Sequence, residues 1–404
     1  MNRGLKKKRI GELVDIYNHI RVPLSSNERE NLAKVYPYYG AQNIVDYVDN
    51  YLFDGEYILV AEDGENLKSN NQNICNLVKG KFWVNNHAHI LKANKDNCNK
   101  YLYYNFNRIY FSPYITGSAQ PKLNKENLLN IITYVHEFPE QQKIASVLSA
   151  LDSKIELNNR INSELEAMAK TLYDYWFVQF DFPDKNGKPY KTSGGKMVWN
   201  EELKREIPDG WEVKLLGDLG NFKNGVNYDP SNPGEIACPI INVRNISASS
   251  YFLKNEDLDI IYLKESDVRK YAVHEGSIII ARSGIPGATR LISDIAENTL
   301  YCGFAIHYEL KNLKNKIPIF FFLKSIEQQI QNGSGGTILK NVNQGTLNAL
   351  LFALPIDNSI TMYFNELIQP IFSKINLIQL EKQKLTELRD WLLPMLMNGQ
   401  VKVN

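Results

Sequence analysis

A pattern that occurs twice along the chain constrains its fold more than any other feature of the sequence. The spacing between the two copies is not constant, so we expect insertions of different length in each. Because one copy is about 200 residues long, the repeat predicts a duplicated domain and not a solenoid of short units. Three segments recur in the same order: YPYYGAQNI (36–44) as CPIINVRNI (238–246), DGEYILVAEDG (54–64) as EGSIIIARSG (275–284), and GSAQPKLNKENL (117–128) as GSGGTILKNVNQGTL (333–347).

Each copy begins with a strand-rich part and ends with a long helix. The strand-rich parts, residues 1–138 and 201–356, contain short apolar runs separated by turn residues, which predicts an α/β domain in each. Residues 179–200 contain Gly187, Pro189, Gly194 and Gly195 and are predicted to form a loop or linker. The resulting division is 1–138, 139–200 (long helix plus linker), 201–356 and 357–404 (second long helix).

The first long helix is predicted to begin at Pro139, which suits the first helical position, with Glu140 in the first turn. Its apolar residues alternate in steps of three and four, as in a coiled coil, and Asn158 lies in the same seam. A buried Asn in such a seam sets the register of the helix pair. The apolar seam positions are Leu151, Ile155, Ile161, Leu165, Met168, Leu172 and Tyr175.

The second helix shows a similar stripe and is predicted to end near Pro394 and Gly399, with Pro370 expected to kink or divide it. Each helix is about 38 residues, or roughly 55 Å at 1.5 Å per residue. We expect the two to pair antiparallel within the chain; the alternative is that each lies on its own domain. The stripe consists of Leu367, Ile371, Ile375, Ile378, Lys382, Leu385, Leu388 and Leu392.

The predicted fold class is therefore α+β: two α/β domains separated by two long helices that form an intramolecular antiparallel coiled coil, with a pseudo-two-fold repeat. Duplex DNA has a matching two-fold axis, and its half-sites lie roughly 34–36 Å apart per helical turn. Two domains held by a rod of this length could read two half-sites across an unread spacer. Because the copies differ in sequence, the half-sites should differ too.

Bulk composition fits this expectation only if positive charge is local. The formal net charge is +1, which argues against a protein that binds DNA by bulk electrostatic attraction. The four cysteines are widely spaced and form no CxxC pair, which favours reduced thiols in the cytoplasm over disulfides or a zinc site. We see no apolar run of membrane-spanning length and no signal peptide.

The same residues resemble the specificity subunit of type I restriction-modification systems. Residues Pro139–Asp184 and Leu385–Val403 are similar to the conserved regions of that family. GWEVKLLGDLGNFKNG (210–225) resembles the opening of a target-recognition domain, and DGEYILVAEDG and GKFWVNNHAHIL (80–91) resemble interior blocks. The first domain lacks the Gly-Trp opening, and the C-terminal GQVKV is a candidate for completing it.

The resemblance implies a non-catalytic chain that recognises a bipartite site in double-stranded DNA. It implies partnership with two modification (methyltransferase) subunits that carry S-adenosylmethionine, and with restriction subunits that use ATP and Mg²⁺ for translocation and cleavage. No cofactor is expected in this chain, and no metal site or membrane association. The function expected is sequence-specific DNA binding within a type I restriction-modification complex, in DNA methylation and anti-phage defence.

Candidate DNA contacts are side chains that can form paired hydrogen bonds with bases, or cations that can neutralise phosphates. Each has a structural alternative, since any one of them can also serve the packing of its own loop. In the first domain they are Gln42, Asn43, Asn85, Asn86, Gln120 and Lys122. In the second they are Arg244, Asn245, Arg282, Ser283, Arg290, Ser334 and Lys340.

Motifs for catalysis are lacking. The sequence contains no P-loop and no Asn-Pro-Pro-aromatic motif of an adenine methyltransferase. His87 and His89 border a candidate DNA-facing loop or close a hydrogen-bonded turn; a metal site is the weaker alternative. Glu62, Asp63 and Glu65 are expected in a solvated loop. Two other function classes remain: a self-contained DNA-modifying enzyme, and a scaffold built on a coiled coil.

Overall fold

The computed structural model describes residues 4–64, 67, 73–117, 121–229, 234–253, 258–333 and 342–403. The chain forms two compact units, and each long helix contributes to both. Unit 1 contains residues 1–157 and 382–404, and unit 2 contains residues 158–381. The packing therefore divides the chain within the helices, whereas the sequence pattern divides it at the helix ends.

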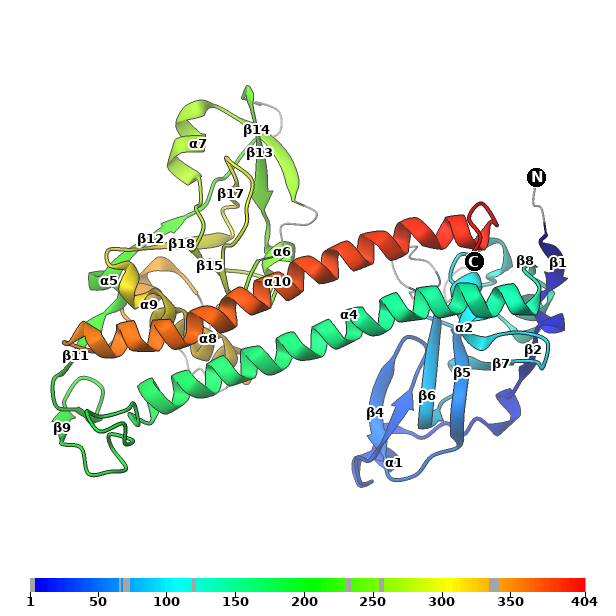
Figure 1. The fold of residues 1–404 in the computed structure, drawn as a ribbon, viewed down its shortest axis with the longest axis horizontal. Coiled ribbons are helices and arrows are strands. Elements are labelled where there is room, and N and C mark those ends of the chain that lie inside the picture. The colour runs from blue at the N-terminus through cyan, green and yellow to red at the C-terminus, as the bar shows by residue number, and fades with distance from the viewer. Residues whose placement is uncertain are drawn as a thin grey trace. The chain divides into compact units, whose positions relative to one another are not determined.

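Unit 1 is built on a six-stranded sheet with the order β2-β7-β5-β6-β3-β4, and a two-stranded ribbon pairs β1 with β8 (Figure 1). Its core lies between this sheet, α2 and the first turns of α4. The elements are β1 Lys6–Arg9, β2 Val14–Ile16, α1 Ser26–Glu30, β3 Tyr36–Tyr39, β4 Ile44–Val48, β5 Phe53–Ala61, β6 Cys75–Val84, β7 Ala88–Ala93, α2 Asn99–Phe106, α3 Lys125–Asn130, β8 Ile132–Val135 and α4 Phe138–Tyr173.

The two longest strands of unit 1 carry facing glycines. Gly55 in β5 pairs with Gly80 in β6, and both have positive φ, 135° and 94°. Such φ values are disfavoured for residues with a Cβ, so glycine lets both strands bend at one place. The side chain of Asn76, before the glycine pair, donates to the carbonyl of Gln42 at 2.6 Å, and the amide of Asn85, after it, donates to the carbonyl of Tyr39 at 3.1 Å.

Unit 2 holds a four-stranded sheet (β12-β18-β15-β16), a three-stranded sheet (β14-β13-β17) and the ribbons β9-β10 and β11-β19 (Figure 1). The elements are β9 Met197–Asn200, β10 Arg205–Pro208, β11 Trp211–Leu215, α5 Leu216–Leu219, β12 Gly220–Asn224, β13 Ile236–Ile241, α6 Val243–Ser247, β14 Asp259–Leu263, α7 Glu265–Tyr271, β15 Ile278–Ala281, β16 Thr289–Leu291, β17 Leu300–Tyr301, β18 Ala305–Leu310, α8 Lys316–Gln331, α9 Gln344–Asn348, β19 Leu351–Pro355 and α10 Asn358–Met397.

The strand pairings confirm the internal repeat. β3 pairs antiparallel with β4 and parallel with β6, and β13 pairs in the same way with β14 and β17. β5 pairs antiparallel with β6 and β7, as β15 does with β16 and β18. The single strand β6 thus corresponds to β16 and β17 together, which are separated by residues 292–299. An insertion in unit 2 takes the place of the glycine bend in unit 1.

The long helices α4 and α10 pair antiparallel, as predicted. In unit 1, Asp152 of α4 accepts a hydrogen bond from Arg389 of α10 at 3.0 Å. In unit 2, Asn158 donates to Glu381 at 2.9 Å and Asn162 to the carbonyl of Ile375 at 3.4 Å. Residue numbers rise along one helix as they fall along the other. Asn158 is buried in the seam, where a polar pair favours one register.

Two expectations for the helices are wrong. Met168 and Tyr175 are exposed, and Ala169, Tyr173 and Trp176 are buried in their place. A straight helix drifts from a 3.5-residue seam, and here α4 turns toward the aromatic core of unit 2. Leu367 and Leu388 are likewise exposed.

Pro370 does not divide α10, which runs unbroken from Asn358 to Met397. An interior proline costs about 3 kcal/mol, through one lost hydrogen bond and a steric clash. Phe364, Ile368 and Ile371 are buried on either side of it. The burial of each contributes roughly 1.5–3 kcal/mol, which outweighs that cost.

The segment predicted as a linker and the opening of the first domain are both ordered by packing. Phe182 stacks on Trp211 in the core of unit 2, and Phe180 meets the same ring edge-on. In unit 1, β1 pairs with β8 as β11 pairs with β19, so this ribbon takes the place of the missing Gly-Trp opening. Leu396 and Met397, near the end of α10, are buried in the same unit.

Candidate nucleic-acid interface

Three turns of unit 1 come together at one place, which we call loop cluster 1: residues 40–43, 62–64 and 85–87, with Arg21 and Lys122. The parallel pairing of β3 and β6 places the first and third turns side by side, because both follow strand ends at the same edge. The second turn joins them because the amide of Glu62 donates to the carbonyl of His87 at 2.9 Å. The strand topology therefore gathers residues that are distant in sequence.

Five of the six candidate contacts predicted for the first domain lie in loop cluster 1. Gln42, Asn43 and Asn86 are exposed, and Asn85 is half-buried. The side chain of Asn85 accepts from the amide of His87 at 2.9 Å, so it shapes the turn. Lys122 is exposed and lies 3.4 Å from Glu62. The sixth candidate, Gln120, lies outside the described residues.

A half-buried carboxylate organises this cluster. Glu62 accepts from Arg21 at 2.7 Å and lies 3.6 Å from the Nδ1 atom of His89. Burial alone would raise the pKa of Glu62, but the Arg21 hydrogen bond and the nearby positive charges outweigh it and lower that pKa. Glu62 is therefore ionised at neutral pH and holds its cations in place.

Sequence reasoning missed Arg21. Its guanidinium donates to Glu62, to the carbonyl of Ala88 at 2.9 Å and to the carbonyl of Asn86 at 3.3 Å. One side chain thus fixes both sides of the turn that carries Asn85 and Asn86. No repeat segment contains Arg21, and its partners in loop cluster 1 are 41 to 67 residues away, so the sequence pattern did not identify it.

Unit 2 contains the corresponding assembly, loop cluster 2: residues 225–227, 242–244, 282–284 and 302–304. The amide of Arg282 donates to the carbonyl of Phe304 at 2.9 Å, as Glu62 does to His87. The amide of Cys302 donates to the carbonyl of Ile241 at 3.0 Å, as Asn85 does to Tyr39. These two backbone hydrogen bonds are equivalent in the two clusters, although the side chains differ.

Three predicted residues of the second domain lie in loop cluster 2. Arg244 is exposed and pairs with Asp259 at 2.6 Å. Arg282 is half-buried and donates to the carbonyl of Gly303 at 3.2 Å. Ser283, also half-buried, follows it in the same turn. Ser334 and Lys340 lie outside the described residues, as does Glu65.

Two other predicted residues are core residues, and the base contacts expected of them are not available in this structure. Arg290 is 4% exposed. It donates to both carboxylate oxygens of Glu327 and to the carbonyls of Ile246 and Ser249. Asn245 is 6% exposed and accepts from the amide of Asn242 as part of a helix cap.

The two histidines of the first domain have different roles. His89 is buried; its Nε2 atom donates to the carbonyl of Leu123 at 2.7 Å, and its Nδ1 atom accepts from Asn18 at 2.8 Å. Burial lowers the pKa of His89, so its ring is neutral near pH 7. His87 is exposed and bonds to Asp63 at 2.8 Å. Among the described residues, no cluster of three or more side chains suits a metal ion.

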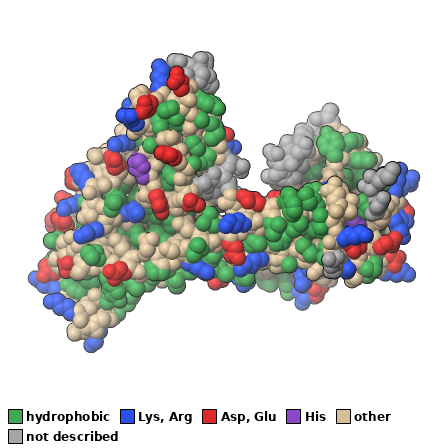
Figure 2. All heavy atoms as spheres, turned by 45° about the horizontal axis from the view of Figure 1, so that its top comes forward, with side chains coloured by type: hydrophobic (Ala, Val, Ile, Leu, Met, Phe, Trp, Pro, Cys, Tyr) green, Lys and Arg blue, Asp and Glu red, His purple; other side chains and the backbone are tan. Residues whose placement is uncertain are grey.

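Surface charge is mixed. Figure 2 shows acidic and basic side chains interspersed over the described part of one face, with no broad area of a single sign. Positive charge near the candidate contacts is confined to individual side chains such as Lys122 and Arg244. None of the described helices is both long enough and apolar enough to cross a bilayer.

Comparison with known proteins defines the class to which this fold belongs. The family described as "Type I restriction modification DNA specificity domain" matches residues 2–167 and 208–390, one match for each copy of the repeat. The chain therefore belongs to the type I restriction-modification specificity family.

Individual relatives agree with this assignment. The chain is 29% identical over 320 residues to the type I restriction enzyme MjaIX specificity subunit of Methanocaldococcus jannaschii, covering 75% of this chain and 69% of that protein. It is 35% identical over 283 residues to a putative specificity subunit of Haemophilus influenzae, covering 70% of this chain and 66% of that protein. A crystal structure of an S subunit from M. genitalium superimposes with a TM-score of 0.62 at 16% identity, over 98% of this chain and 97% of that one, which supports the fold.

Proposed function

We propose that this chain selects the DNA sequence in a type I restriction-modification complex and performs no chemistry itself. Loop cluster 1 would read one half of a bipartite site in double-stranded DNA, and loop cluster 2 the other half. The observation that carries the proposal is the equivalence of the two clusters. The same backbone hydrogen bonds present different side chains, as two readers of two different half-sites require.

The residues available in each cluster suit this task. Asn86 and Gln42 carry amides, which can form paired hydrogen bonds with adenine, and Arg244 can do so with guanine. Lys122 can neutralise a phosphate and so position the domain without specifying sequence. Because the positive charge is sparse, partner subunits are expected to supply much of the phosphate contact.

The helices are the proposed docking region for two modification subunits, which restriction subunits would then join. Several apolar side chains of α10 are exposed in each unit, among them Leu377 in unit 2 and Trp391 in unit 1. Exposed apolar groups of this size favour a partner surface. S-adenosylmethionine, ATP and Mg²⁺ would reside in those partners, and the assembled complex would act in the cytoplasm.

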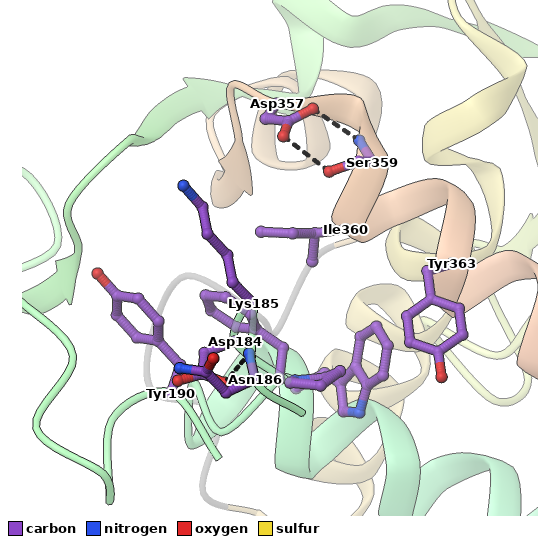
Figure 3. A pocket seen from close by; sticks show the side chains of 11 residues that line it. Asp184, Lys185, Asn186, Tyr190, Asp357, Ser359, Ile360 and Tyr363 are labelled. Carbon is purple, nitrogen blue, oxygen red and sulfur yellow. Dashed lines mark hydrogen bonds between the residues drawn. The ribbon is translucent and has the colours of Figure 1, made fainter. Parts of the chain in front are cut away.

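A cavity in unit 2 is a second part of this docking region. It has a volume of about 630 Å³ and is lined by Trp176, Phe182, Tyr190, Ile360 and Tyr363, among others. Figure 3 shows Ile360 of α10 directed toward the loop that carries Asp184 to Tyr190, with Tyr363 further along the same helix. An aromatic-lined cavity of this size has room for several apolar side chains of a partner.

A gel-shift experiment with a randomised duplex library, with and without a modification subunit, tests the proposal. The complex should enrich one bipartite motif and methylate it when S-adenosylmethionine is added. Methyl transfer by the chain alone would indicate a self-contained enzyme. Failure of the complex to enrich any sequence would indicate a scaffold.

A further inference from the structure

One turn position is equivalent in both units and exposes its side chain in each. His87 is the last residue between β6 and β7, and Phe304 is the last residue between β17 and β18. The carbonyl of His87 accepts from the amide of Glu62, which follows β5, and the carbonyl of Phe304 accepts from the amide of Arg282, which follows β15, both at 2.9 Å. The His87 side chain is 49% exposed, and Phe304 is 64% exposed.

The two turns are held rigidly by similar means. An arginine donates to the carbonyl of the middle residue in each: Arg21 to Asn86 and Arg282 to Gly303. The first residue of each turn donates its amide to the end of a parallel strand. The backbone is thus organised before any ligand arrives, which lowers the entropy cost of binding through these side chains.

Asp63 orients the imidazole of His87. This carboxylate, 18% exposed, bonds to Nδ1 at 2.8 Å. An ionised carboxylate can only accept, so Nδ1 must carry the proton. Among the described residues Nε2 has no hydrogen-bond partner. It is left as an acceptor in the neutral ring, or as a donor in the imidazolium form.

Phe304 offers different chemistry at the equivalent place. Among the described residues its ring has no aromatic or cationic partner, and about two thirds of the residue faces water. An exposed phenyl group can contact the thymine methyl in the major groove, whereas it forms no useful bond with a phosphate.

We propose that His87 and Phe304 are specificity-determining residues, one for each half-site. His87 forms a hydrogen bond through Nε2 with a base edge, and Phe304 makes an apolar contact with a thymine methyl. Asp63 is a positioning residue that acts through His87. This proposal rests on the proposed function of the two loop clusters.

The test is to assemble the complex with modification subunits and to determine the methylated motif by sequencing. The two test variants are His87→Ala and Phe304→Ala. Each variant should lose about tenfold discrimination at one base position of its own half-site and leave the other half-site unchanged. Each serves as the control for the other. His274 is exposed and precedes β15, whereas loop cluster 2 follows this strand. The variant His274→Ala should therefore change neither half-site.

Conservative variants distinguish base recognition by these side chains from a purely structural role. Phe304→Leu keeps an apolar group and should retain part of the preference for thymine. Asp63→Ala should relax the same base position as His87→Ala, and Asp63→Asn, which keeps an acceptor for Nδ1–H, should restore most of it. A purely structural role for Asp63 would lower the thermal midpoint of unfolding without changing preference at that base.

Three other results would overturn the inference. An unchanged motif in both alanine variants would exclude base reading. An equal loss of methylation at all sequences would indicate phosphate contact. Relaxation of both half-sites by one variant would show that the turns are not independent. If the wild-type complex yields no motif at all, the proposed function itself fails, so the two failures are distinguishable.

Discussion

Arg21 and Arg282 come from unrelated places in the chain, yet each donates to the middle carbonyl of an equivalent turn. A guanidinium has several donors in a fixed plane, so it can satisfy a turn carbonyl and a second partner at once. Arg21 uses this to join the turn to Glu62. The backbone of the two candidate interfaces is maintained by residues that need not touch DNA.

Arg290 permits a test of structural role against base reading. Arg290→Met should lower the free energy of unfolding by about 3 kcal/mol, because Glu327 loses a buried partner and three buried carbonyls lose a donor. Urea unfolding of the purified chain measures this. Arg244→Met, which removes an exposed ion pair, should cost less than about 1 kcal/mol. If Arg290→Met kept the stability of the wild type and changed the methylation motif, Arg290 would be a base contact after all.

His307 in β18 predicts a pH dependence. Burial lowers its pKa from 6.5 to about 4, despite the opposing charge of Glu309. Between these two values the unfolded chain binds a proton that the folded chain excludes, so stability is lost as pH falls. From pH 6.5 to 4.5 the wild type should lose about 2 kcal/mol more than His307→Gln. Urea titrations at both pH values compare them, and parallel losses would show that His307 is not responsible.

At the scale of elements, α4 serves two packing arrangements in succession. Near Asn158 it pairs with α10 through a polar contact, and from Ala169 it enters an aromatic core with Tyr173 and Phe177. The heptad pattern predicted the first arrangement. The second depends on two residues far along the chain: Phe321, which stacks on Tyr173, and Phe364, which meets it edge-on.

The helices should set the spacing between the half-sites. Four residues inserted after Ser163 lengthen α4 by about 6 Å and rotate it slightly more than one turn. On B-DNA 6 Å is nearly two base pairs, so the unread gap should lengthen by one or two base pairs while both half-sites persist. Sequencing of methylated DNA gives the motif.

A four-residue insertion between Glu201 and Glu202, in an exposed turn of unit 2, is the matched control and should leave the gap unchanged. An active Ser163 variant with the original gap would mean that the helix does not set the spacing. Altered half-sites would mean that sequence recognition by the two domains depends on the helix, which would contradict independent recognition by each domain.

For the whole molecule, the proposal predicts no activity without partners. The purified chain incubated with S-adenosylmethionine and unmodified DNA should transfer no methyl groups, because its sequence contains no adenine methyltransferase motif. The measurement is incorporation of labelled methyl groups, with the chain plus modification subunit as the positive control. Transfer above a protein-free background would contradict a purely recognising role.

The order of elements could be predicted from the sequence because it depends on local patterns. The repeat, the strand-rich parts and the two long helices all follow from periodicity and turn residues, and the antiparallel pairing follows from two apolar stripes in one chain. Much of loop cluster 1 could also be predicted from the sequence, because polar turn residues after buried strands are candidates for binding.

Only the tertiary structure decided which polar side chains face solvent. Arg290 and Asn245 resembled the other candidates in sequence, but the structure buries both, with hydrogen bonds to Glu327 and Asn242. The turn carbonyls that Arg21 binds, those of Asn86 and Ala88, are 65 and 67 residues further along the chain, so the local sequence does not reveal this role. The same holds for Pro370, which α10 tolerates because apolar residues on either side of it are buried in unit 2. Local periodicity depends on neighbours in the chain, whereas burial depends on residues brought together from distant segments, so the first is readable in the sequence and the second is not.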